Sequence, residues 1–250
     1  MKKINLLLVF ILAFTNMYSQ DLNGKIEYSI ESFKQNKKAR DVSKKINSNI
    51  KNLVSEVIAK SKDLKLLLYF NNNKSFFTSP DPLNINKKEE RLLLLAKTTT
   101  GIQGNYYYIP KKNLLVTDRE FMGERFIIEE VINKSRWNLI NETEKIGDFS
   151  CYKAERIIEY ITRKGKKKRK QVVWYTTEIP LPYGPIDFVG LSGLVVKVID
   201  RNLVFSIKKI ELNPKEKIDI EIPKKGNRVT KEEFDKIVEE SSLEIILKKN

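Results

Sequence analysis

The sequence predicts an α+β fold, mainly antiparallel β, in which one curled or half-barrel antiparallel sheet is backed by an amphipathic helix. Runs with strand-type alternation, each about five to eight residues long, recur from residue 105 to 212 between turn formers. One amphipathic helix is predicted over 43–60. Because no Ser/Gly/Pro-rich linker divides the chain, we expect one antiparallel β domain over 20–212 and a C-terminal strand and helix appendix over 213–250.

The first third of the chain alternates between strand and helix patterns. Residues 24–30 predict a strand, and the helix over 43–60 has Asp41 or Ser43 available as its N-cap. Two further strands are predicted within 64–79, joined by three asparagines that tolerate a tight turn. Residues 87–97 predict a short helix that starts at Asn86, although the four consecutive leucines fit a buried strand equally well.

The remaining chain is predicted to be almost wholly strand. The strand patterns lie at 105–110, 113–118, 125–132 and 137–144, in two hairpins over 150–179 and 194–212, and in a short strand over 217–222. The second hairpin turns through Arg201 and Asn202. After Thr230 the Thr-Lys-Glu-Glu sequence predicts a helix that begins with a capping box.

The N-terminus has the layout of a secretory signal peptide over 1–19. Lys2 and Lys3 precede a short apolar run, and Ser19 offers a cleavage point. The apolar run is too short for a stop-transfer helix, and no cysteine follows it to accept a lipid. We therefore expect an exported protein, periplasmic or extracellular, with no transmembrane segment after signal cleavage.

The amino-acid composition limits which disulfides, metal sites and cofactors the chain can have. The net charge is +15 at pH 7, and removal of 1–19 takes away two lysines and no acid, so the exported chain stays strongly basic. There is no histidine and one cysteine, Cys151, which excludes an intrachain disulfide and removes the usual ligands of zinc, copper and haem. Carboxylates such as Asp118 with Glu120, or Glu129 with Glu130, lack the spacing of a calcium loop. We expect no cofactor and no metal.

Residues 178–200 raise the question of a reaction site or a structural corner. Prolines cannot donate to a strand ladder, and glycines permit a turn or a close backbone approach, so we interpret the stretch as a corner. The "GLSGL" segment superficially matches a nucleophile elbow, but Leu194 replaces the final glycine and a strand follows where a helix is needed. Since no histidine is present, Ser192 lacks its ordinary general base.

This region resembles the GLPGLI family, exported proteins of Bacteroidetes-type bacteria. The matching motif residues are Trp174, Tyr175, Thr176, Glu178, Ile179, Pro180, Gly184, Pro185, Phe188, Gly190, Leu191, Gly193 and Leu194, with Trp137, Ile146, Gly147, Cys151, Lys153 and Ala154 upstream. Ser192 stands where the family has the proline of its name. The likeness extends from about 105 to 212, and the family has no established activity, so it implies export and fold rather than function.

The strongest electrostatic feature is the segment "TRKGKKKRK", residues 162–170, between two predicted strands. It is predicted to be a hairpin tip, either simply solvated or in contact with phosphates. The candidate anion-binding residues are Arg163, Lys164, Lys166, Lys167, Lys168, Arg169 and Lys170.

Three function classes remain. The first is a noncatalytic cell-envelope protein that binds an apolar ligand, such as a lipid, or a protein or peptide partner on its curled sheet. The alternative is a basic interaction protein that contacts anionic polymers or lipid A through the 162–170 hairpin. The second alternative is a hydrolase whose carboxylates are dispersed along the sequence.

Overall fold

The computed structural model describes residues 22–33, 47–162 and 165–247. The predicted signal peptide, the predicted caps Asp41 and Ser43, and the basic residues Arg163 and Lys164 lie outside the described residues.

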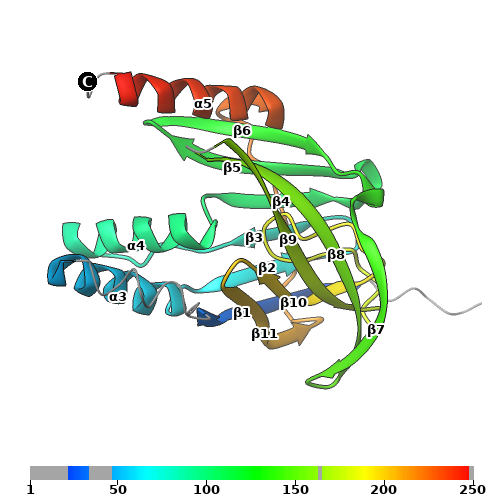
Figure 1. Ribbon diagram of the computed structural model, residues 1–250. Coiled ribbons are helices and arrows are strands. Elements are labelled where there is room, and N and C mark those ends of the chain that lie inside the picture. The colour runs from blue at the N-terminus through cyan, green and yellow to red at the C-terminus, as the bar shows by residue number, and fades with distance from the viewer. Residues whose placement is uncertain (1–21, 34–46, 163–164, 248–250) are drawn as a thin grey trace, which may run out of the picture.

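The described chain builds one open sheet of twelve strands in the order β12-β6-β5-β4-β3-β2-β1-β11-β10-β9-β8-β7 (Figure 1). Every neighbouring pair is antiparallel except β12 with β6. The strands are β1 (Gly24–Phe33), β2 (Leu66–Phe70), β3 (Ser75–Thr78), β4 (Asn105–Ile109), β5 (Leu114–Phe121), β6 (Glu124–Val131), β7 (Asn138–Ile146), β8 (Phe149–Thr162), β9 (Gly165–Thr176), β10 (Leu194–Asp200), β11 (Leu203–Leu212) and β12 (Asn227–Thr230). The predicted α+β class is confirmed, with the sheet open rather than closed into a barrel.

Within the described residues, three α-helices accompany the sheet: α3 (Ser48–Lys62), α4 (Lys87–Thr100) and α5 (Lys231–Leu247). The helical interpretation of the leucine run is confirmed, because Asn86 and Glu89 form a capping box at the start of α4. The predicted capping box at Thr230 is also present, since the Glu233 amide donates to the Thr230 hydroxyl and the Thr230 amide donates to the Glu233 carboxylate. Two short 3-10 helices, η1 (Pro110–Lys112) and η2 (Lys134–Arg136), precede β5 and β7.

Helix α3 does not cover the sheet as predicted. It begins at Ser48 with Asn47 as its cap, packs mainly along α4 and contacts the sheet chiefly at β1. Its side chains Ile50, Leu53 and Val54 are exposed. The apolar periodicity therefore predicted the helix correctly, but not the face on which it lies.

The sheet curls around its own connection between β9 and β10. In Figure 1, β8 and β9 rise across the face of β2–β4, and the segment 177–193 lies between these two parts of the sheet. The main hydrophobic core fills this concave face and joins residues from nearly every strand to that segment. At its centre, the buried Tyr28 hydroxyl donates to the Val195 carbonyl oxygen at 2.6 Å.

The outer face of the sheet is crossed by residues 213–226, which we call the strap. The strand predicted over 217–222 is wrong: this part of the strap is extended but pairs with no strand. The alternation of isoleucines in the strap reflects packing rather than strand pairing, because Ile220 is buried against Tyr107 on the outer face. After the strap, β12 adds a parallel edge to β6, and α5 packs through Phe234 against Phe126.

Among the described residues, no helix combines the length and the apolar character needed to cross a membrane.

Candidate functional site

The motif predicted as a corner fills the inside of the curl. After β9 the chain returns to β10 through backbone hydrogen bonds from Gly190 to Pro182, from Leu194 to Ile179 and from Val195 to Tyr183. Five buried residues of the segment belong to the main core: Ile179, Tyr183, Phe188, Val189 and Leu191. Tyr175 and Leu194 of the flanking strands belong to the same core. The interior of the curl is therefore filled by the protein's own side chains, which leaves little room for an apolar ligand among them.

The remaining motif residues hold this segment in place. The Glu178 carboxylate accepts a hydrogen bond from the Ser150 amide at 2.8 Å, and Trp174 packs on the outer face with Cys151. A Cβ at Gly184 would overlap the Phe188 carbonyl oxygen, and Gly190 has a φ of +89°.

Ser192 is exposed beside a small pocket of about 220 Å³ that Tyr108 and Pro182 help to line. Pro180 is exposed at the rim of this pocket, whereas Pro185 is buried. The residues that line this pocket include no carboxylate and no lysine that could act as a general base for Ser192.

The basic segment differs from the predicted tip. Residues 165–170 belong to β9 and pair with β8, beyond the last paired residues of β7 and β10, so they form a projecting two-stranded ribbon. Lys168 pairs with Glu159 at 3.1 Å, and Lys170 pairs with Glu155 at 2.8 Å. Lys166 and Lys167 are exposed. Three of the five described cations thus have carboxylate partners, since Arg169 also pairs with one on the concave face.

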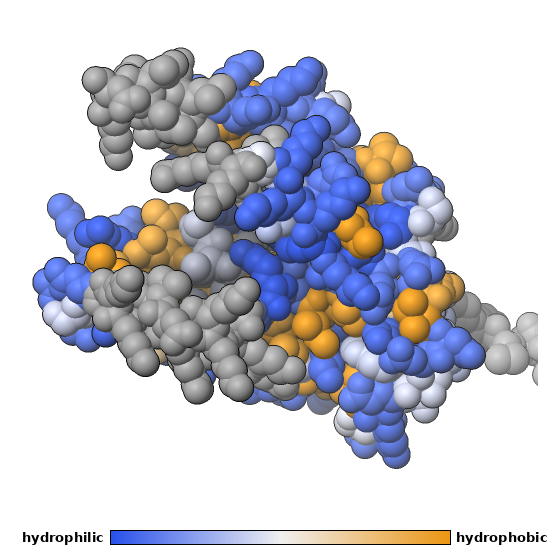
Figure 2. Space-filling model, viewed as in Figure 1, coloured by the Kyte–Doolittle hydropathy of each residue, from blue (hydrophilic) through white to orange (hydrophobic). Residues whose placement is uncertain are grey.

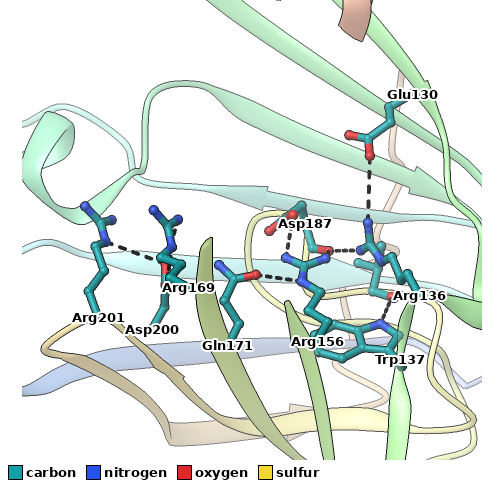
Figure 3. Close-up of polar contacts among 10 residues, drawn as sticks. Glu130, Arg136, Trp137, Arg156, Arg169, Gln171, Asp187, Asp200 and Arg201 are labelled. Atoms are coloured by element: carbon teal, nitrogen blue, oxygen red, sulfur yellow. Dashed lines mark hydrogen bonds and ion pairs between the residues drawn. The ribbon is translucent and has the colours of Figure 1, made fainter. Parts of the chain in front are cut away.

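A polar band crosses the concave face where the core ends (Figure 3). It consists of Glu130, Arg136, Arg156, Arg169, Gln171, Asp187, Asp200 and Arg201. Arg156 is its centre: its side chain is 3% exposed, donates to the Gln171 oxygen and the Asp187 carboxylate at 2.6 Å each, and lies 4.6 Å from the Trp137 ring.

The pKa values of two carboxyl groups in the band, Glu130 and Asp187, are shifted in opposite directions. Burial and the neighbouring Asp187 raise the pKa of Glu130 above 4.5. Burial also disfavours ionisation of Asp187, but Arg156 and Arg136 overcome this, so the pKa of Asp187 lies below 3.8. Because Arg156 bonds the Asp187 carboxylate directly, that oxygen is engaged in the fold rather than free to act as a general base.

A large concave surface lies on the opposite, outer face. It is a groove of about 1590 Å³, partly open to solvent, whose floor is the outer face of β1–β5. A row of side chains crosses the floor in register: Lys25, Tyr69, Phe76 and Tyr107. The Phe76 and Tyr107 rings stack at 4.7 Å between centroids, and the Lys25 ammonium lies 5.5 Å from the Tyr69 ring.

A second, polar row runs beside the aromatic one. The Thr78 hydroxyl donates to the Asn105 side-chain oxygen at 2.6 Å, and the Asn105 amide donates to Asp118 at 3.5 Å. Arg125 then donates twice to the same carboxylate, at 2.7 and 2.8 Å. Asp118 is 9% exposed in its side chain while Arg125 is 52% exposed, so the row ends in a fixed, accessible guanidinium.

The walls of the groove are tied to its floor. On one side Lys74 donates to the Ile220 carbonyl oxygen at 2.9 Å, which fixes the strap. On the other side Lys97 of α4 donates to the Ser79 carbonyl oxygen at 2.7 Å and pairs with Asp81. Charged residues of both signs line the groove: Lys25, Asp81, Lys97, Asp118, Arg119, Glu120, Arg125, Glu211, Glu216, Lys217 and Asp219.

Cys151 is buried, and burial raises the pKa of its thiol to about 11, so the thiolate is disfavoured at neutral pH. No group of three or more His, Cys, Asp or Glu residues in the described part of the chain could hold a metal ion.

Comparison with known proteins finds one family model that matches the central region of the chain. Residues 137–197 match the family model "Protein of unknown function (Porph_ging)". The Porph_ging match runs from Trp137 in front of β7 to Lys197 in β10, and so includes the corner motif and the ribbon. No curated protein sequence matches the chain.

Two solved structures are weakly similar to this chain. They are the structures of PNGF-II in the C2 and P21 space groups, with TM-scores of 0.46 and 0.49 and identities of 13% and 14%. The matches cover 84% and 88% of this chain and 31% and 33% of the other chains. The chain therefore spans about a third of the length of the structures that it matches.

Sequence reasoning placed the motif and the basic residues but missed both polar surfaces. The Porph_ging region contributes Arg156, Arg169, Gln171 and Asp187 to the concave band, whereas none of the residues that line the groove belongs to it. The sequence indicates the aromatic row only in part, because it shows an aromatic residue in each of β2, β3 and β4 but not that these residues lie side by side. Its alignment depends on strand register, which the sequence does not state.

Proposed function

We propose that the protein is an exported, noncatalytic binding protein of the cell envelope that holds an extended peptide segment of a partner in the outer-face groove. The observation that carries the proposal is the groove itself, about 1590 Å³, partly open to solvent and lined by charges of both signs. Sites for small apolar molecules are enclosed and mostly apolar. A partly open groove with charges of both signs suits an extended polypeptide better than an enclosed lipid.

The two rows of the floor supply complementary contacts for such a segment. Tyr69 and Phe76 are half-buried and present ring edges for apolar side chains. Asn105 and Arg125 present amide and guanidinium N–H groups that can donate to peptide carbonyl and carboxylate oxygens, and the Thr78 hydroxyl oxygen can accept from a peptide N–H.

The binding test uses the mature chain and a displayed library of random dodecamer peptides. We expect selection to enrich a sequence class that binds the parent protein, and Tyr69→Ser to weaken that binding about tenfold, as loss of an aromatic anchor does. Tyr152→Ser is the matched control, because Tyr152 is 42% exposed on β8, away from the groove. No enrichment over an unrelated protein of equal charge, or equal loss in both variants, would refute the proposal.

Export is tested separately. The basic start, short apolar run and Ser19 cleavage point support secretion. We expect protein recovered from the envelope fraction to begin at or near Gln20 by intact mass. Recovery of a chain with Met1 from the cytoplasm alone would reject the proposed localisation.

A further inference from the structure

One main-chain edge of the strap is fixed to the turn between β2 and β3. The Asn71 side-chain amide donates to the Ile218 carbonyl oxygen at 3.4 Å. Two residues further on, the Lys74 ammonium donates to the Ile220 carbonyl oxygen at 2.9 Å. The side chains of Ile218, Ile220 and Ile222 all pack in the same outer-face cluster. Carbonyl groups and side chains that repeat their direction every second residue are those of an extended chain.

The opposite edge of the strap is free and borders the groove. In an extended chain, the main-chain N–H and C=O groups point to alternate sides from one residue to the next. Those of Lys217 and Asp219 therefore point away from the β2–β3 turn, and within the described part of the chain they make no hydrogen bond. Both residues line the groove, as do Tyr69 and Thr78, which lie further from the turn on β2 and β3. Unpaired main-chain groups along an extended edge are a template for another strand.

The floor beside this edge offers apolar contact. The Tyr69 and Phe76 rings are half-buried and pack against the same cluster as Ile218. A second extended segment beside the strap sends every second side chain toward these rings. On the other side of the sheet, Figure 2 shows mainly hydrophilic residues in the hollow between α4 and α5. A segment with one apolar side therefore fits the outer floor.

The end of the groove beside the strap carries an excess of acid. Three carboxylates, of Glu211, Glu216 and Asp219, accompany the two lysines Lys25 and Lys217 there. Lys25 lies opposite Glu211 in strand register, so these two charges face each other. Opposite charges at facing positions of neighbouring strands are stabilising. In a segment that pairs with the strap, a basic residue beside Asp219 complements this edge.

We propose that the partner's segment binds as an added strand along the free edge of the strap. Its apolar residues face the floor at every second position, and a basic residue lies beside Asp219. This inference rests on the proposed function and names the class of segment that the groove takes, an amphipathic strand. Strand addition gains affinity from main-chain hydrogen bonds and specificity from the alternate side chains.

The first test uses the mature chain and the tightest-binding dodecamer from the displayed library. Each main-chain N–H of the dodecamer is replaced by N–CH3, one position at a time. Over the bound stretch, we expect every second replacement to weaken binding about three- to tenfold, because it removes a hydrogen bond to the strap. The replacements between them should change affinity less than twofold. Enriched sequences should alternate apolar with polar residues and include Lys or Arg among the polar ones.

The second test removes an N–H from the strap itself. Asp219→Pro deletes one donor of the free edge at an exposed position, and proline fits an extended chain. We expect it to weaken binding about three- to tenfold. Lys224→Pro is the matched control, because Lys224 is exposed in the strap and does not line the groove, and it should change affinity less than twofold. If Asp219→Pro fails to fold, the N-methyl scan on the parent chain decides alone.

The outcomes separate this inference from the proposed function. Suppose that a dodecamer binds and that Tyr69→Ser weakens it. N-methyl sensitivity without a period of two, or equal losses in Asp219→Pro and Lys224→Pro, then overturns strand addition and leaves peptide binding standing. If the library yields no dodecamer that binds, both are refuted.

Discussion

Gly193 shows at the residue scale why the corner needs its glycines. It stands where the chain re-enters the sheet before β10, and a Cβ there would overlap the Thr176 carbonyl oxygen. Its neighbour Ser192 is exposed and could carry a side chain of another kind without a clash of this type. The glycine requirement thus comes from close approach of two backbones and not from chemistry at the serine.

We therefore expect Gly193→Ala to lower the free energy of unfolding by roughly 1 to 3 kcal/mol, because the backbone must move to admit the methyl group. Ser192→Ala should change it by less than about 0.5 kcal/mol, as surface substitutions usually do. Urea unfolding of both variants beside the parent decides this. Equal stability of Gly193→Ala and the parent would show that the close approach is not required.

Glu130 makes a pH-dependent contribution to stability. Its pKa in the folded protein is raised above 4.5 by burial and by Asp187. Between 4.5 and the raised value, the folded state binds a proton that the unfolded chain has lost, so stability falls as pH rises through this window. The uncharged carboxyl is the form that the fold prefers.

Glu130→Gln mimics the protonated form at every pH. We expect its stability relative to the parent to be smallest at pH 4 and to grow through the window above pH 4.5, levelling off by neutral pH. Urea unfolding from pH 4 to 8 measures the difference. A difference that stays constant over this range would contradict the raised pKa.

The ribbon formed by β8 and β9 illustrates the element scale. Its sequence predicts a charged tip, yet pairing with β8 extends β9 back to Gly165, because cross-strand acids offset the lysine repulsion. Arg169 faces inward to Asp200, so only part of the cationic run is surface charge. A linear count of charges cannot separate the two faces of a strand, since alternate side chains point to opposite sides.

The ribbon can be tested without disturbing Asp200. The triple change of Lys166, Lys167 and Lys168 to Gln should leave the unfolding temperature nearly unchanged, and we expect anionic vesicles to retain the variant and the parent alike across a salt series. A flatter salt dependence in the variant would instead support the alternative function, contact of the ribbon with anionic polymers.

On the scale of the whole molecule, local patterns predicted the elements and the single antiparallel sheet, but not the positions of α3 and the strap relative to it. Strand alternation and turn residues gave the hairpins, and the capping residues gave the starts of α4 and α5, because these signals act within a few residues. The strap shows the limit of such patterns. Alternating isoleucines indicate that one side of a segment is buried, and this holds both for a strand paired in a sheet and for an unpaired segment that crosses the sheet. The position of α3 likewise depends on its packing against α4, which the apolar periodicity of α3 alone does not predict.

The candidate sites were less predictable for the same reason. The groove joins β1–β5, the β3–α4 connection and the strap, and the concave band joins β6 through β10. Neither is continuous in sequence, so each becomes visible only when strand register and curl are known. The basic run was visible in the sequence because its residues are adjacent.

Amide hydrogen exchange of the mature chain, with and without the tightest-binding dodecamer, tests the central claim most directly. The account predicts added protection in β2 and β3 and in the strap around Ile218, and no added protection in β8, which Tyr69→Ser should abolish while Tyr152→Ser preserves it. Protection confined to the concave face, or none at any described segment under saturating peptide, would contradict the assignment of the outer-face groove as the binding site.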